Sequence, residues 1–95
     1  MDQSFTAVLW YWRGPAPFYF LTVPPRLCRE LAAIAPAVTY GWGMIPAIVR
    51  VGDSEWTTSL FPKDGGYVIP VKADVRHAEQ LEDGEDVTAQ LIVDA

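Results

Sequence analysis

Positively charged side chains recur in the second half of the chain, close to a hydroxyl group and aromatic rings. Lys72 precedes Arg76 by four residues, so on a helix both side chains face the same side. Ser59 and Lys72 lie on the two arms of a predicted hairpin, and the helix start adds free N–H groups. Cations and such donors bind carboxylates and phosphates. The pattern predicts a binding corner for an anionic or aromatic ligand, made by Ser59, Lys63, Lys72, Arg76, Trp56 and Tyr67.

The same cations have carboxylates near them along the chain, and this supports a second interpretation. Lys72 and Arg76 would pair with Asp74, Glu79 or the acids at positions 82–86 as structural ion pairs. Surface ion pairs are common and contribute little to stability. Of the two interpretations, the sequence favours the ion pairs.

Residues that support catalysis or metal binding are sparse. His77 is the only histidine; it has no visible nucleophile or orienting acid, so we expect a surface residue rather than a catalytic base. Cys28 is the only cysteine, which excludes an intrachain disulfide and a cysteine-cluster metal site; we expect an inert core thiol. The C-terminal acids lack the spacing of a calcium loop. The sequence therefore predicts no enzyme, no cofactor and no metal.

The elements that position these residues alternate between strand and helix patterns. Period-two alternation predicts strands over residues 5–12, 18–23, 44–51, 56–61, 67–71 and 87–93. Residues 26–35 and 72–81 carry helical patterns, and a turn is expected over 13–17. The prediction is one domain over residues 1–95, a mostly β double-split β-barrel of order β-β-α-β-β-β-α-β, with the first helix covering one barrel end.

Prolines and glycines indicate where some of these elements end or turn. Pro36 should end the first helix, and Pro70 indicates a sheet edge or a bulge because it cannot donate to a ladder. Gly41 and Gly43 flank Trp42, which leaves two interpretations. The loop either displays the indole to a ligand or folds it over the barrel mouth, and burial is favoured because it removes a large apolar surface from water.

Charge is distributed unevenly along the chain. Residues 73–95 hold seven acids and one base, a charge of −6, whereas residues 1–72 hold five acids and six bases, a charge of +1. The acidic C-terminal third repels phosphate backbones, so nucleic-acid binding is disfavoured. No apolar stretch is long enough to span a membrane, and the first residues are acidic and polar rather than a leader. The expected location is therefore cytoplasmic.

The long motif of the second half resembles a bacterial domain of unknown function, the one numbered nineteen-oh-five. Its pattern is W-x-T-S-L-F-P, then G-x-Y-x-L-P-V-K-x-x-V-R, then G-D-x-V, and here it runs from Trp56 to Val87. The resemblance implies a double-split β-barrel and brings no settled activity. Residues 69–87 are similar, more weakly, to swapped-hairpin AbrB/MazE barrels. In this chain Glu85 stands where an aspartate usually follows the glycine.

Two classes of function follow. The favoured one is a non-enzymatic binding module for a small anionic or aromatic ligand or a protein partner. The alternative is an AbrB/MazE-like dimeric regulator of the DNA-binding or antitoxin type, which requires a basic face built from Arg13, Arg26, Arg29 and Arg50. Apolar residues on both faces of the first strand, residues 5–12, motivate the expectation of a homodimer.

Overall fold

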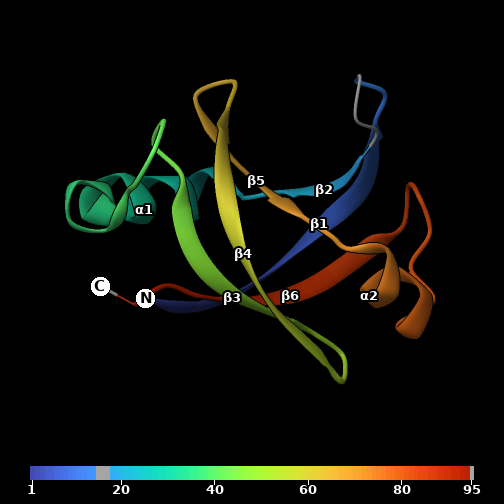
Figure 1. The fold of residues 1–95 in the computed structure, drawn as a ribbon. Coiled ribbons are helices and arrows are strands. Elements are labelled where there is room, and N and C mark those ends of the chain that lie inside the picture. The colour runs from blue at the N-terminus through green and yellow to red at the C-terminus, as the bar shows by residue number, and fades with distance from the viewer. Residues whose placement is uncertain (15–17, 95) are drawn as a thin grey trace.

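A computed structural model describes residues 1–14 and 18–94, and within them six antiparallel strands form a closed barrel with two helices (Figure 1). The order around the barrel is β1-β2-β5-β4-β3-β6. This confirms the predicted mostly β barrel and its element order; of the predicted turn over 13–17, residues 15–17 lie outside the described residues. The elements are β1 (Asp2–Trp12), β2 (Phe18–Thr22), α1 (Pro25–Val38), β3 (Ile45–Val51), β4 (Ser54–Lys63), β5 (Gly66–Pro70), α2 (Ala73–Ala78) and β6 (Asp86–Ile92).

The long strand β1 closes the barrel because it pairs with two different neighbours. Its first part, residues 2–8, pairs with β6, and its last part, residues 9–12, pairs with β2. Each of the other strands also has a partner on both sides. No described strand is left with an open edge, so the barrel is complete within one chain.

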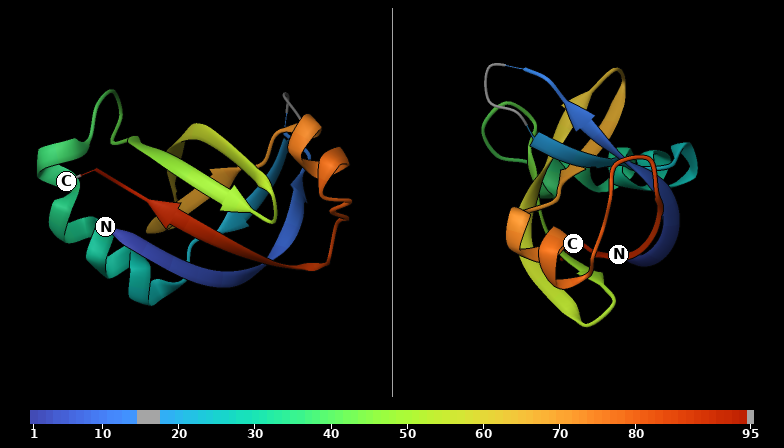
Figure 2. Two further views of the ribbon diagram at one scale, coloured as in Figure 1. Left: turned by 90° about the horizontal axis from the view of Figure 1, so that it is seen from below. Right: turned by 90° about the vertical axis from the view of Figure 1, so that its right-hand side faces the viewer.

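Alternating aliphatic side chains fill the interior, as strand β3 illustrates. Ile45, Ala47, Val49 and Val51 are buried, while Arg50 between the last two is exposed. Further residues, Leu27 and Leu31 of α1 and Val75 of α2, join the same core. The two helices lie at opposite ends of the barrel, α1 beside both chain termini (Figure 2). The expectation that the first helix covers one barrel end is met.

The prediction that Pro36 ends the first helix is wrong, because α1 continues to Val38. Proline removes one N–H donor and strains the preceding turn, which usually stops a helix. Here it falls in the last turn, and the N–H of Thr39 still donates to the carbonyl of Ala35 at 2.9 Å. The helix therefore continues for two residues beyond its proline.

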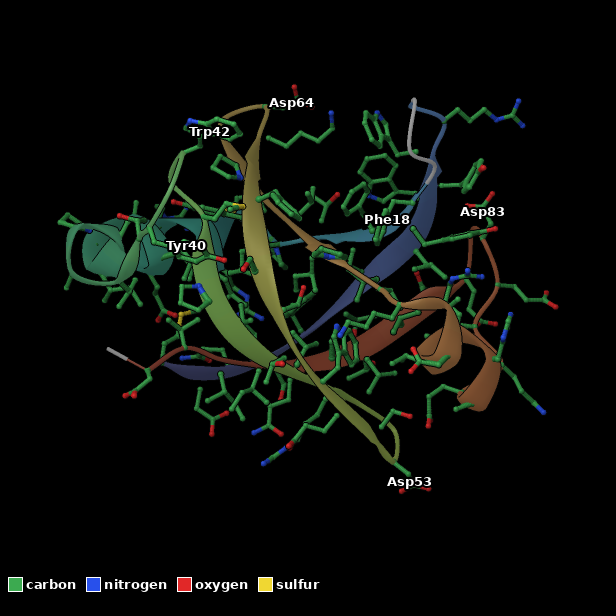
Figure 3. All side chains as sticks on the ribbon, in the orientation of Figure 1. Phe18, Tyr40, Trp42, Asp53, Asp64 and Asp83 are labelled. Carbon is green, nitrogen blue, oxygen red and sulfur yellow. The ribbon has the colours of Figure 1, made fainter. Side chains whose placement is uncertain are left out.

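The prediction that Trp42 folds over the barrel mouth is also wrong, since its side chain is 97% exposed. Gly41, Trp42 and Gly43 have φ angles of 25°, 48° and 78°. Tyr40 and Met44 close the loop through two backbone hydrogen bonds, each of 3.0 Å. This tight turn displays the ring at the same end of the molecule as Asp64 of the β4–β5 hairpin (Figure 3).

Pro70 was expected at a sheet edge or a bulge, and it is the last residue of β5 in a closed barrel. The ladder between β5 and β4 has already ended at Val68, whereas Pro70 still pairs with Phe20 of β2. Its missing N–H therefore interrupts no ladder with β4. The carbonyl of Pro70 accepts a hydrogen bond from the indole of Trp56 at 3.2 Å.

Candidate functional site

The six residues predicted to form one binding corner are distributed over separate places. Lys72 and Arg76 line one cavity, and Lys63 and Tyr67 line a different one beside α1. The two others have structural partners, since the hydroxyl of Ser59 is hydrogen-bonded to that of Tyr40 and Trp56 is 6% exposed. From the predicted corner, the structure brings Lys72 and Arg76 together on one helical turn.

The local fold holds these two cations in place. Arg76 donates its N–H to the carbonyl of Lys72 at 3.0 Å, which confirms the predicted spacing of one helical turn. Buried Val75 anchors α2 to the core, and Val71 donates its N–H to the carbonyl of Tyr19 in β2 at 2.9 Å. The helix is shorter than the predicted 72–81, because Gln80 has a φ of 54°.

A cavity of about 520 Å³ lies at the junction of the β1–β2 hairpin and α2. We call it the cation–tyrosine pocket. Tyr11 and Tyr19 are a cross-strand pair whose ring centroids are 4.9 Å apart. The guanidinium of Arg76 stacks on the Tyr19 ring, 3.9 Å from its centroid, a favourable cation–π geometry. The lining residues are Tyr11, Phe18, Tyr19, Val71, Lys72, Ala73 and Arg76.

The ion pairs that the sequence favoured for Lys72 and Arg76 do not form within the described part of the chain, where Arg50 and Glu55 make the one salt bridge. The nearby acids have other partners. Asp74 accepts the N–H of Val75 at 3.0 Å, and Glu79 accepts the hydroxyl of Ser54 at 2.7 Å. The prediction of these ion pairs was wrong because spacing along the sequence does not show in which direction a carboxylate side chain points.

Arg76 carries a further unusual feature. Its Nε atom is buried and has no hydrogen-bond partner among the described residues. Buried polar groups are nearly always paired, so an unpaired one calls for an explanation. The protein therefore leaves the hydrogen-bonding capacity of this guanidinium partly unused beside the cavity.

A second concave surface lies on the outer side of the barrel, over β1, β2, β5 and β4, and has a volume of about 360 Å³. The ring centroid of Phe20 lies 5.3 Å from that of Trp10, 5.7 Å from that of Phe18 and 6.2 Å from that of Trp12. Sequence reasoning noted apolar residues on both faces of β1 but missed this surface, because it depends on cross-strand register. We call it the aromatic groove, and its lining residues are Trp12, Phe18, Phe20, Phe61, Pro62, Lys63, Val68 and Pro70.

A third cavity, of about 700 Å³, lies between α1 and the β4–β5 hairpin. Cys28 contributes to its lining together with Arg29 and Lys63. The thiol is partly buried and donates to the carbonyl of Val23 at 3.3 Å, so it packs at the margin of the core. His77 is exposed on α2, as the sequence predicts.

Two further features concern residues 1–14 and 18–94. No group of three or more His, Cys, Asp or Glu side chains in these ranges is placed to hold a metal ion. Neither helix in these ranges has the length and apolarity to cross a membrane.

The sequence model of the family described as "Domain of unknown function (DUF1905)" matches residues 5–91. No curated protein matches the chain.

Proposed function

The chain belongs to the DUF1905 family, and from its site we propose that it is a non-enzymatic module that binds a small anionic aromatic ligand in the cation–tyrosine pocket. One observation carries the proposal. Lys72 and Arg76 line a cavity with Tyr11 and Tyr19, and neither cation has a salt-bridge partner in the described part of the chain. The volume of about 520 Å³ falls within the range of small-molecule sites, roughly 300–1,000 Å³.

Arg76 is suited to orient the anion. Stacking on Tyr19 fixes the plane of its guanidinium, and a planar guanidinium donates from its edge to a carboxylate or a phosphate. No described group accepts a hydrogen bond from its buried Nε, so a turn of the guanidinium toward the ligand breaks no bond at that atom. Lys72 adds a second positive charge on a flexible stem.

The aromatic side chains suit the rest of the ligand. Tyr11 and Tyr19 offer ring faces and edges for a ligand ring, and their hydroxyl groups donate or accept hydrogen bonds. Phe18 and Val71 supply apolar contact at the margin. We therefore assign a carboxylate or phosphate attached to an aromatic ring.

Binding rather than turnover is proposed because of the side chains that line the pocket. Lys and Tyr serve as catalytic groups in some enzymes, but general acid–base and nucleophilic sites mostly combine them with a His, a carboxylate, a Cys or a Ser beside the reacting atom. The seven lining residues are aromatic, aliphatic or cationic. They can hold and orient an anion.

The dimeric DNA-binding alternative is not proposed, because two of the four arginines it needs are engaged. Arg50 pairs with Glu55, and Arg26 donates to the carbonyl of Ser4 at 3.1 Å. No contact among the described residues favours a basic DNA-binding face over the cation–tyrosine pocket.

The experiment is a calorimetric titration with 2-naphthoate and with 2-naphthamide, which has the same ring system without the charge. The wild-type protein should bind the acid more tightly than the amide. Arg76→Ala should weaken naphthoate binding by about 10- to 100-fold, because a hydrogen bond to a charged group contributes roughly 1.5–3 kcal/mol. Binding should change little for the amide.

Arg50→Ala is the matched control, since it removes a surface arginine outside the pocket and leaves the same net charge as Arg76→Ala. It should keep the wild-type affinity for naphthoate. Equal losses in Arg76→Ala and Arg50→Ala would refute the site, as would failure of the folded wild-type protein to bind either compound.

A further inference from the structure

The Trp42 loop presents a large apolar ring to solvent in a defined geometry. The side chain is 97% exposed, although burying an indole is strongly favourable. A positive φ is a true outlier for a bulky residue, and it persists only where the surroundings enforce it. Here the Tyr40–Met44 bridge and the Tyr40–Ser59 hydroxyl contact hold the loop against β4. The fold therefore fixes the backbone of the loop, and the ring that it carries lies in solvent.

The aromatic groove is a receptive surface on the same molecule. Three of its rings remain substantially exposed, Trp12 at 38%, Phe18 at 41% and Phe61 at 40%. An exposed apolar patch of this kind marks an interaction site. Its volume of about 360 Å³ is at the lower end of the range for ligand sites, which suits one large ring.

The loop and the groove adjoin one another. A Cβ placed on Gly43 would lie 3.4 Å from the Cγ atom of Pro62, and Pro62 lines the groove. Trp42 and Asp64 lie at the same end of the molecule, whereas Asp53 lies at the opposite end (Figure 3). At 97% exposure, the indole makes almost no contact with its own groove.

We infer that the chain forms a reversible homodimer in which Trp42 of each copy enters the aromatic groove of the other. A surface that carries a projecting ring beside a receptive groove is complementary to itself. A two-fold axis close to Pro62 places each ring opposite the groove of the partner, the isologous arrangement of symmetric dimers.

Charge and area are consistent with a weak dimer. Lys63 is the one charged residue among the groove-lining side chains, and it offers a cation–π contact to an incoming indole. Asp64 follows it at the hairpin tip, so the two charges nearly cancel at this end. Two indoles bury about 300–500 Å² of their own surface. The grooves that receive them bury about as much, so the total stays below the roughly 1,200 Å² of small stable interfaces. The dimer should therefore dissociate on dilution.

The test is sedimentation velocity over a concentration series from micromolar to millimolar, with Trp42→Asn and Phe61→Ala. Asn tolerates the left-handed backbone, so the loop keeps its shape. Wild-type protein should shift from monomer to dimer, and each variant should weaken the dimer at least tenfold, as expected for aromatic anchors at an interface. Val8→Ala, at a 48% exposed apolar residue outside the groove lining, should dimerise like wild type.

A mixed-label NMR sample identifies the contact directly. Intermolecular NOEs are expected between the Trp42 indole of one copy and the Phe20 and Phe61 rings of the other. Wild-type protein that stays monomeric at millimolar concentration would overturn the inference. A dimer that persists in Trp42→Asn would also overturn it, as would Trp42 resonances independent of concentration.

Discussion

Single residues of one chemical type have different roles in this protein because their surroundings differ. Arg76 and Arg50 carry the same group, but Arg50 is paired with Glu55 and Arg76 is stacked on a tyrosine beside a cavity. Trp42 and Trp56 form a similar contrast, one almost fully exposed and the other in the core. At this scale, partners and burial decide which side chains are available to a ligand or to another protein.

Trp56 was predicted to contact ligand, and its environment predicts a structural role. Trp56→Phe removes the hydrogen bond to the Pro70 carbonyl and leaves that buried acceptor unpaired. The free energy of unfolding should fall by about 1–3 kcal/mol, measured by urea denaturation. Naphthoate affinity of the folded variant should equal that of wild type. A large loss of naphthoate affinity at an unchanged free energy of unfolding would show that Trp56 belongs to the binding site.

At the scale of elements, the short helix α2 depends on the strands around it. Six residues are too few for a stable isolated helix. Val75 packs in the core, and the Ser54–Glu79 hydrogen bond ties the residue after α2 to the β3–β4 turn. Gly52 in that turn has a φ of 56°, and a Cβ there would collide with the carboxylate of Glu79. The turn and the helix that presents Arg76 are therefore coupled.

Gly52→Ala tests this coupling. The substitution places an alanine in the left-handed region, which costs roughly 1–2 kcal/mol, and it displaces Glu79 from Ser54. We expect the unfolding free energy to fall by about 2–3 kcal/mol in total, and the backbone amides of α2 to exchange faster with deuterium. Gly65→Ala is the control, because Gly65 also has positive φ but no atom lies within 4 Å of its added Cβ. Similar α2 exchange in both variants would argue against the coupling.

The whole molecule is a closed ring of strands whose two ends meet. The ammonium of Met1 donates to the carbonyl of Val93 at 2.7 Å, beside α1. Because the barrel is closed, each strand is stabilised by two neighbours. We therefore expect the stability of the barrel to depend on the pairing of the strands more than on where the chain begins and ends. Exposed loop tips between strands are the places where a break is tolerated.

A circular permutant tests this view. Joining residues 94 and 1 by a short flexible linker and opening the chain between Asp64 and Gly65 should give a folded protein, because every strand keeps both partners. Opening between Val49 and Arg50 should fail, since β3 pairs there with both β4 and β6. Thermal unfolding followed by circular dichroism distinguishes them. Equal cooperativity in the two permutants would show that strand closure is not what stabilises the barrel.

Much of the fold was predictable because its signals are local. Alternation along residues 45–51 or 86–92 needs only the geometry of one strand, and the four-residue spacing of Lys72 and Arg76 needs only one helical turn. The wrong predictions concern residues whose local conformational preference is overridden by a tertiary contact. Pro36 lies within α1 because the turn after it still closes, and Trp42 is exposed because a bridge enforces left-handed backbone.

The succession of strands and helices along the chain and the closeness of Lys72 to Arg76 were present in the amino-acid sequence, since both follow from the periodicity of neighbouring residues. The pairing of Tyr11 with Tyr19 was not, nor was the lack of a carboxylate partner for Arg76 among residues 1–14 and 18–94. These depend on cross-strand register and on the direction in which each acid turns, which arise when segments distant in the chain pack together. The binding pocket is for this reason a property of the folded barrel.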